Sequence, residues 1–239
     1  MTRIAIVHDY LTQRGGAERV VLSMARAFPD AVIHTSLYDP DATFPELTDL
    51  DIRPMITNRF RFFRNDHRRG LPLYPAVFSR TQVDADAVIC SSSAYAHGIR
   101  TDGVKVVYSY TSPRWLYDEA DTYMSQWSTP VVIATKAMRP LLRRWDQYAA
   151  SSADHYLTTS STVRDRIWRD YGIKAEIVPP GTNLDPGGVQ TPVGDLRCGF
   201  ALCVSRLLSY KNVDDVAQAF RRLPDVPLVI VGDGQKATR

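Results

Sequence analysis

The stretch Val204-Ser205-Arg206-Leu207-Leu208-Ser209-Tyr210-Lys211-Asn212-Val213-Asp214-Asp215 decides the fold class, because it joins an apolar segment to an amphipathic one. Residues 200–204 have the composition of a buried parallel strand, and residues 214–223 repeat apolar side chains at a helical period. Arg206 and Lys211 fall in the loop between them, at the carboxyl end of the strand. Open α/β sheets bind ligands at that end, and a helix N-terminus there favours anions. The pattern predicts an anion site, with two solvated surface cations as the alternative.

The same alternation of short apolar strands and helical patterns runs through the rest of the chain. It predicts an α/β fold, in which a Rossmann-like parallel sheet with helices on both faces forms an N-terminal domain over residues 1–180. Residues 179–197 hold four prolines and four glycines with almost no periodicity, which is typical of a linker. We therefore predict a linker over residues 181–197 and the start of a second Rossmann-like domain over residues 198–239. The strands are expected at 4–7, 31–35, 87–90, 104–108, 155–158, 175–178, 200–204 and 228–231, and the helices at 17–28, 71–82, 135–150, 162–171 and 214–223.

Composition narrows the function classes. The chain is 44% hydrophobic and 23% charged with a net charge of +3, which is ordinary for a globular protein and too small to indicate nucleic acid as a partner. The three cysteines, Cys90, Cys198 and Cys203, are odd in number and lack the spacing of a zinc site or a disulfide framework. No apolar run approaches the ~18 residues of a membrane span, so we expect a cytoplasmic protein with reduced thiols.

Gly15 and Gly16 stand between the first strand and the first helix. Glycines let the backbone approach a ligand, and the helix that follows offers free N–H groups to an anion; a plain tight turn is the alternative. The pair is part of neither a P-loop nor a G-x-G-x-x-G motif, so dinucleotide binding of the usual Rossmann kind is not indicated. Near the other end, Gly232-x-Gly234 also fails to complete that motif.

Residues 58–70 carry five arginines and three phenylalanines in thirteen positions. Interleaved Arg and Phe suit an anionic membrane surface or a phosphorylated acceptor, whereas a helix with its arginines outside and its phenylalanines inside is the structural alternative. Single-stranded nucleic acid is disfavoured, because nothing else in the chain extends the patch. The candidate contact residues are Arg59, Arg61, Phe62, Phe63, Arg64, Arg68 and Arg69.

Two polar and aromatic loops, residues 91–98 and 109–118, follow strands and are expected to face the same crevice as the glycine pair. They make His97, Tyr110, Arg114 and Asp118 candidates for substrate contact. A lone histidine is more often structural, so that alternative stays open for His97.

In this order and spacing, the motifs resemble those of glycosyltransferase family 4. The resemblance rests on the opening strand and glycine loop (residues 4–18), on residues 91–98 and 108–118, on Thr159-Ser160-Ser161-Thr162 with Tyr171-Gly172, on Val178-Pro179-Pro180, on residues 204–220 and on Val231-Gly232-Asp233-Gly234. It implies a GT-B fold of two Rossmann-like domains, and retaining transfer of a sugar such as mannose or another hexose. The donor would be UDP- or GDP-linked, no metal or other cofactor would be required, and the acceptor would be a glycan or a lipid-linked molecule.

The resemblance also implies roles for single residues. Arg206 and Lys211 match the pair that grips the donor diphosphate, and Gly15-Gly16 match the glycine loop that approaches the donor. Relatives usually carry histidine where this chain has Tyr110, and tyrosine is a poorer proton acceptor near neutrality. Tyr110 and His97 are therefore the catalytic candidates, with Arg114 and Asp118 on the acceptor side.

Family members continue through a later pair of glutamates that hold the donor's sugar and ribose. We therefore expect a truncated chain with little transfer activity on its own, placed in the cytoplasm or on the inner face of the membrane. The alternative is a non-catalytic binding module that docks on a membrane or partner through its basic segment.

Overall fold

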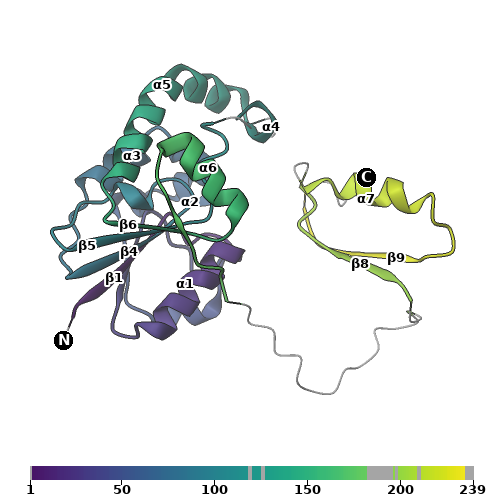
Figure 1. Cartoon of the computed structure of the whole chain (residues 1–239), viewed down its shortest axis with the longest axis horizontal. Coiled ribbons are helices and arrows are strands. Elements are labelled where there is room, and N and C mark those ends of the chain that lie inside the picture. Colours follow the sequence, from purple (N-terminus) through teal and green to yellow (C-terminus); the bar gives the residue numbers. More distant parts are fainter. Residues whose placement is uncertain are drawn as a thin grey trace. The chain divides into compact units, whose positions relative to one another are not determined.

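The computed structural model describes residues 2–117, 120–124, 127–181, 196, 199–208 and 211–234, without the side chain of Thr122. The chain divides into two compact units, Met1–Thr182 and Asn183–Arg239 (Figure 1). The predicted linker, residues 181–197, lies almost wholly outside the described residues.

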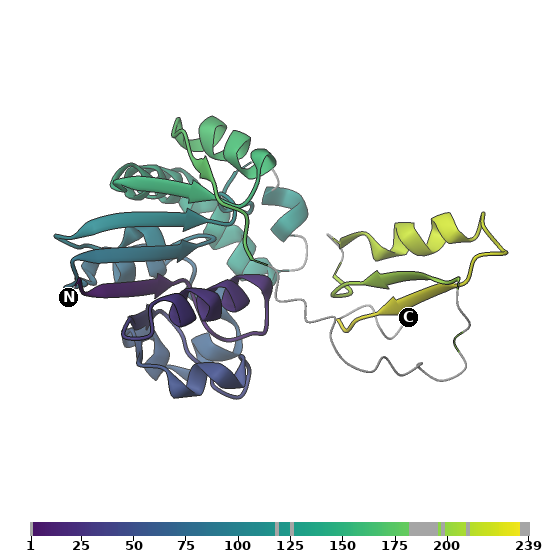
Figure 2. The same cartoon turned by 60° about the horizontal axis from the view of Figure 1, so that its bottom comes forward.

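The first unit is built on a seven-stranded sheet in the order β3-β2-β1-β4-β5-β6-β7, and every strand pair is parallel. In Figure 2 the arrowheads of β1, β4 and β5 accordingly point the same way. The parallel sheet confirms the predicted fold class. Its strands are β1 (Ile4–His8), β2 (Val32–Thr35), β3 (Ile52–Pro54), β4 (Ala87–Ser92), β5 (Val104–Ser109), β6 (His155–Thr158) and β7 (Glu176–Ile177).

Helices cover both faces of this sheet. Helix α1 (Gly16–Ala27) lies on one face, and α3 (Tyr74–Arg80), α5 (Thr129–Ser151) and α6 (Ser161–Tyr171) lie on the other (Figure 1). Two buried clusters correspond to the two faces, and β1 contributes to both: Ile6 packs with α1, while Ala5 and Val7 belong to the larger core on the other face. This alternation follows from the period of two along a strand.

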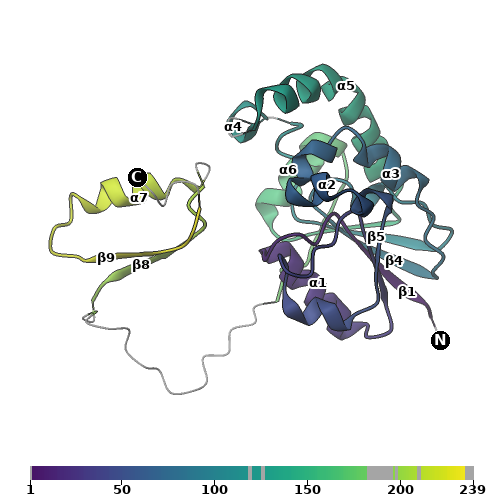
Figure 3. The ribbon, with the colours of Figure 1, turned by 180° about the vertical axis from the view of Figure 1, so that it is seen from behind.

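Shorter helices complete the first unit. Helix α2 (Arg61–Asn65) stands near α3 in the view from behind (Figure 3), and α4 (Ala120–Met124) precedes α5. Single 3-10 turns occupy η1 (Pro45–Asp49), η2 (Ile56–Arg59), η3 (His67–Gly70) and η4 (Ala96–Gly98).

Two helices of the first unit have other bounds than expected, and one strand was not expected at all. The helix expected at 71–82 covers only Tyr74–Arg80, with Pro75 in its first turn and Pro72 before it, positions at which proline is well tolerated. The helix expected at 135–150 begins earlier, at Thr129, with a proline in its first turn. Strand β3 was missed, since its three residues include Arg53 and Pro54 and show no apolar run.

The second unit contains a parallel pair of strands, β8 (Ala201–Val204) and β9 (Leu228–Val231), connected through α7 (Val213–Phe220). Residues 200–204 were expected to form a buried strand, but Leu202 is 57% and Val204 is 70% exposed. Alternate side chains of β8 point away from its packed face, which corrects that expectation.

Candidate functional site

The strand order places a topological switch point between β1 and β4. From β1 the chain moves outward through β2 to β3, and it then crosses back to β4 on the other side of β1. In open α/β sheets ligands bind outside the carboxyl ends of the strands at such a point, because the connecting loops there diverge. His8 and Ser91, which stand opposite each other in the register of β1 and β4, mark this edge.

Asp9 fixes the loop that follows β4. Its buried carboxylate accepts four backbone N–H bonds, from Ser93 (2.6 Å), Ala94 (3.0 Å), Tyr95 (2.8 Å) and Ala96 (2.7 Å). Bonds from N–H groups to a charged acceptor are stronger than neutral ones, so a single side chain determines where the loop runs. The loop is thereby fastened to the end of β1 across the switch point.

A chain of hydrogen bonds links β1, β4 and the loop after β5. His8 Nδ1 lies 3.0 Å from the Ser91 carbonyl oxygen and 2.9 Å from Ser91 Oγ, and Ser91 Oγ lies 2.9 Å from the Tyr110 hydroxyl. Tyr110 in turn donates to the carbonyl oxygen of Ala17 at 3.2 Å. The Ser91 carbonyl oxygen can only accept a hydrogen bond, so we assign a hydrogen to His8 Nδ1. The Ala17 carbonyl oxygen takes the hydrogen of the Tyr110 hydroxyl, so the Ser91 hydroxyl donates to Tyr110.

Glu18 lies on the other side of His8, at the end of this series of hydrogen bonds. Its carboxylate is 1% exposed, accepts from Gln13 Nε2 at 2.9 Å, and has Oε1 4.0 Å from His8 Nε2. Burial acts to raise the pKa of Glu18, but His8 and Gln13 together hold it below its usual value. The residue therefore carries a negative charge at neutral pH. Among the described residues, its second oxygen, Oε2, has no hydrogen-bond partner.

The glycine pair makes room for this carboxylate. A Cβ at Gly15 would lie 2.4 Å from Glu18 Oε2, whereas one at Gly16 would meet nothing within 4 Å. Gly15 is the N-cap of α1 with extended backbone, so its lack of a side chain serves close approach rather than an unusual conformation. The two glycines thus do different things, and the site depends on the first.

We refer to His8, Gln13, Glu18, Ser91 and Tyr110 as the switch-point network. Burial raises the pKa of Tyr110 far above its ordinary value, outweighing the opposite effect of Ser91. Tyr110 therefore stays protonated at neutral pH and is suited to hydrogen bonding rather than to accepting a proton. Sequence reasoning found only Tyr110 of these five. The signal for His8 was its place directly after four apolar strand residues.

His97 lies in a second buried network. Its ring is 2% exposed, with Nδ1 2.9 Å from Ser92 Oγ and Nε2 3.0 Å from Asp146 Oδ1, and Tyr117 donates to the other oxygen of Asp146 at 2.8 Å. Both ring nitrogens are thus engaged by protein groups. This geometry suits a residue that orients the loop after β4, and the catalytic role of His97 stays a prediction.

The acceptor-side candidates are only partly described. Arg114 is half-buried in the turn after β5, and Asp118 lies outside the described residues.

No described helix is both long enough and apolar enough to cross a membrane. Within the described ranges, no group of three or more His, Cys, Asp or Glu side chains is placed to hold a metal ion.

The basic segment, residues 58–70, is folded around η2, α2 and η3. Phe60 and Phe62 are 56% and 57% exposed, whereas Phe63 is half-buried against the core. The guanidinium of Arg69 stands 4.4 Å over the ring of Phe62, and Arg64 donates to the backbone of Asn58. The segment therefore presents aromatic rings and cations together on the surface.

The second unit holds the predicted diphosphate pair. Arg206 and Lys211 are both exposed and lie between β8 and α7, where the sequence placed them. The loop carrying Arg206 is held against the loop after β9, because Ser205 N bonds Val231 O at 3.0 Å and Leu207 N bonds Asp233 O at 2.9 Å.

Two glycines allow this contact between the loops. A Cβ at Gly232 would come within 1.8 Å of Ser205 O, and one at Gly234 would come within 2.5 Å of Leu207 O. Gly232 and Gly234 thus allow the backbone after β9 to lie directly against the backbone on either side of Arg206.

These features define a class: a doubly wound, Rossmann-like unit with a polar network at its switch point, and a second unit whose strand–loop–helix carries two cations. The model of Glycosyltransferase Family 4 matches residues 14–186. The chain belongs to this family, as its motifs predicted.

Comparison with solved structures supports this fold through HepE. HepE from Anabaena, whose crystal structure is described as a complex with UDP-glucose, aligns with a TM-score of 0.59 at 14% identity, over 98% of this chain and 61% of HepE. The chain therefore spans less than two thirds of the length of HepE. The apo form of the lipopolysaccharide outer core galactosyltransferase WaaB aligns with a TM-score of 0.48 at 16% identity, over 99% of this chain and 69% of WaaB. A comparison with curated proteins found no match.

Proposed function

We propose that this protein takes part in retaining transfer of a hexose from a UDP- or GDP-linked donor to a glycan or lipid-linked acceptor. The observation that carries the proposal is the switch-point network beside Gly15, in a chain that belongs to glycosyltransferase family 4. The complex of HepE with UDP-glucose supports a nucleotide-sugar as the donor.

In this proposal Arg206 and Lys211 bind the donor diphosphate. Charge grows on the departing diphosphate as the glycosidic bond breaks, so fixed cations there stabilise the transition state more than the ground state. Protein cations supply this stabilisation in place of a divalent ion. The reaction would then proceed without a metal or another cofactor.

Tyr110 would contact the substrate as a hydrogen-bonding group. Its hydroxyl is held by Ser91 and by the backbone of Ala17, so its direction is set before any ligand binds. His97 and Asp146 would position the loop after β4, and Arg114 and Asp118 would serve the acceptor side.

Thermal unfolding of the 239-residue chain with UDP, GDP and a panel of their hexose derivatives tests the donor proposal. A ligand that binds only the folded state raises the midpoint, by an amount equivalent to about 2.7 kcal/mol at a hundred times its Kd. We expect one nucleotide series to raise the midpoint in EDTA, and Arg206→Ala to abolish the rise. Arg221→Ala, an exposed arginine at the end of α7, is the control.

Release of nucleoside diphosphate and the anomeric configuration of the product, followed by NMR, would then test transfer and retention. If no nucleotide or nucleotide-sugar shifts the midpoint, the donor proposal fails.

The exposed rings and cations of the basic segment favour a second role, contact with an anionic membrane on its cytoplasmic face. Flotation with anionic and neutral liposomes tests it. Arg61→Glu should release the protein from the anionic liposomes, and Arg144→Glu on the exposed side of α5 should not. Equal flotation with both lipids would exclude this contact.

A further inference from the structure

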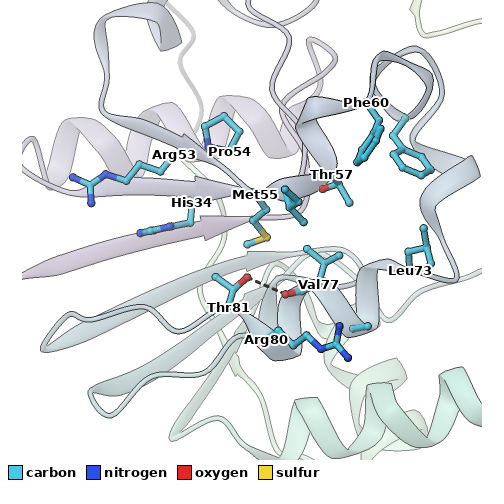
Figure 4. A pocket seen from close by; sticks show the side chains of 13 residues that line it. His34, Arg53, Pro54, Met55, Thr57, Phe60, Leu73, Val77, Arg80 and Thr81 are labelled. Atoms are coloured by element: carbon cyan, nitrogen blue, oxygen red, sulfur yellow. Dashed lines mark hydrogen bonds between the residues drawn. The ribbon is translucent and has the colours of Figure 1, made fainter.

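A groove of about 570 Å³ lies next to the basic segment in the first unit. It is bounded on one side by the edge strand β3 and its neighbour β2, and on the other by α3. Figure 4 shows Met55, directly after β3, above Val77 of α3 and above Thr81, the C-cap residue of that helix. The lining residues are His34, Arg53, Pro54, Met55, Ile56, Thr57, Phe60, Phe63, Leu73, Ala76, Val77, Arg80 and Thr81.

The groove offers apolar surface and few free polar groups. Its two hydroxyl side chains are already used within the protein, because Thr57 donates to Ser36 O at 2.7 Å and Thr81 donates to Val77 O at 2.9 Å. A sugar or a peptide backbone in the groove would leave polar groups unpaired, which costs several kcal/mol for each group in an apolar setting (about 2–7). An apolar chain meets no such cost, and the groove's volume is within the range of ligand sites.

Two arginines flank the apolar lining, and they differ in their partners. Arg53 is paired with Asp51 at 2.9 Å. Arg80, exposed at the end of α3, has no ion-pair partner among the described residues. A guanidinium next to an apolar groove is suited to a phosphate at the end of an apolar chain, since its planar N–H groups match phosphate oxygens.

The groove is continuous with the basic segment. Phe60 and Phe63 belong to that segment and also line the groove, and the exposed Arg59 and Arg61 bracket Phe60. An anionic amphiphile would therefore meet cations on the outside and apolar side chains inside. The cationic surface and the apolar groove therefore adjoin each other, as do the charged headgroup and the apolar tail of such a molecule.

We propose that the groove binds the single apolar tail of a lipid phosphate, whose headgroup pairs with Arg80. The occupant is identified by charge complementarity and by the absence of free hydroxyls among the lining side chains. This inference extends the membrane contact proposed above and does not depend on sugar transfer, so its test uses neither liposomes nor a donor.

Isothermal titration calorimetry of the full chain with decyl phosphate, below its micelle concentration, tests the proposal. Decyl maltoside, which has the tail without the charge, and methyl phosphate, which has the charge without the tail, are the comparison ligands. We expect measurable binding of decyl phosphate, about tenfold weaker binding of decyl maltoside, as for the loss of one charge-assisted contact, and none of methyl phosphate.

Two pairs of variants locate the binding. Ala76→Trp fills the groove from an exposed position of α3 and should abolish binding, whereas Ala134→Trp, at an exposed position of α5, should not. Arg80→Gln should weaken decyl phosphate about tenfold and leave decyl maltoside unchanged, and Arg144→Gln should change neither.

A methyl signal gives a readout in the wild-type protein itself, and a variant is needed only to assign it. In protein labelled at its methionine methyl groups, decyl phosphate should shift the Met55 resonance, assigned with Met55→Leu. The proposal is overturned if the Met55 signal does not move, if decyl maltoside binds as tightly as decyl phosphate, or if folded Ala76→Trp binds like the wild type.

Discussion

Replacing Gly15 by alanine isolates the contact on which the switch-point network depends. Gly15 has φ −118° and ψ 179°, a conformation that alanine adopts freely, so the change brings no backbone strain. The new methyl group would instead lie 2.4 Å from Glu18 Oε2, a distance at which one of the two must move. Glu18 is 1% exposed and has little room to do so.

The expected magnitude follows from what Glu18 gives up by moving. It would lose the 2.9 Å bond from Gln13 and its 4.0 Å approach to His8 while its charge stays buried. A buried group that loses its partner costs about 1–3 kcal/mol, more when it is charged, and we expect about 2 kcal/mol in the free energy of unfolding. For a unit of this size, that corresponds to a fall of about 4–8 °C in the unfolding midpoint.

Thermal and urea unfolding, followed by circular dichroism, measure this effect. Gly16→Ala is the matched control: a Cβ there meets nothing within 4 Å, and alanine favours the helix, so the variant should be as stable as the wild type or slightly more so. In a Glu18→Ala background, Gly15→Ala should cost almost nothing, because the clashing carboxylate is gone. Equal midpoints for Gly15→Ala and Gly16→Ala, or an undiminished cost in that background, would refute the reasoning.

Three further outcomes are expected. Asp9→Asn should lower the free energy of unfolding by about 2–3 kcal/mol and speed amide hydrogen exchange at residues 93–96. The reason is that a side-chain amide has only one acceptor oxygen for the four N–H groups. Unchanged exchange at these residues would contradict the role of Asp9. Burial, and to a smaller extent Arg68, lowers the pKa of His67 from the ordinary 6.5 to about 4. Between these pH values the unfolded chain binds more protons than the folded one, so the free energy of unfolding should fall by about 1.4 kcal/mol per pH unit as the pH drops from 6.5 towards 4. His67→Phe should flatten this slope, and a slope equal to that of the wild type would count against the prediction. Gly232→Ala should destabilise the second unit by about 1–3 kcal/mol and shift the amide signals of residues 203–207 in NMR spectra, because its Cβ would strike Ser205 O; an unperturbed spectrum would rule this out.

Much of the fold follows from patterns that are local in the sequence. The strands at 155–158 and 228–231 have the bounds that were predicted, and α6 ends at Tyr171 with Gly172 as its C-cap, whose φ of 70° favours glycine. The three-residue strand β3 escapes such reasoning, because only its pairing with β2 defines it. Its residues have no pattern of their own to read.

The candidate site was also predictable only where its signal is local in the sequence. Gly15 and Tyr110 could be found from their positions after strands, but the partners that give them their roles could not. Ser91 is 83 residues from His8, and Tyr110 is 93 residues from Ala17. Only the strand order brings them together, and no spacing rule in one sequence encodes it. The exposure of Phe62 likewise depends on how α2 packs.

The four bonds of Asp9 join positions that are 84 to 87 residues apart. A loop of that length must close before the first of these bonds forms, and the entropy lost in closing it is recovered only as β1 and β4 pair. Assembly of the crevice is therefore tied to the slow, non-local step of folding, and we expect both to appear with one rate constant. Amides 93–96 would then gain protection from exchange together with the central strands, and not with the helices.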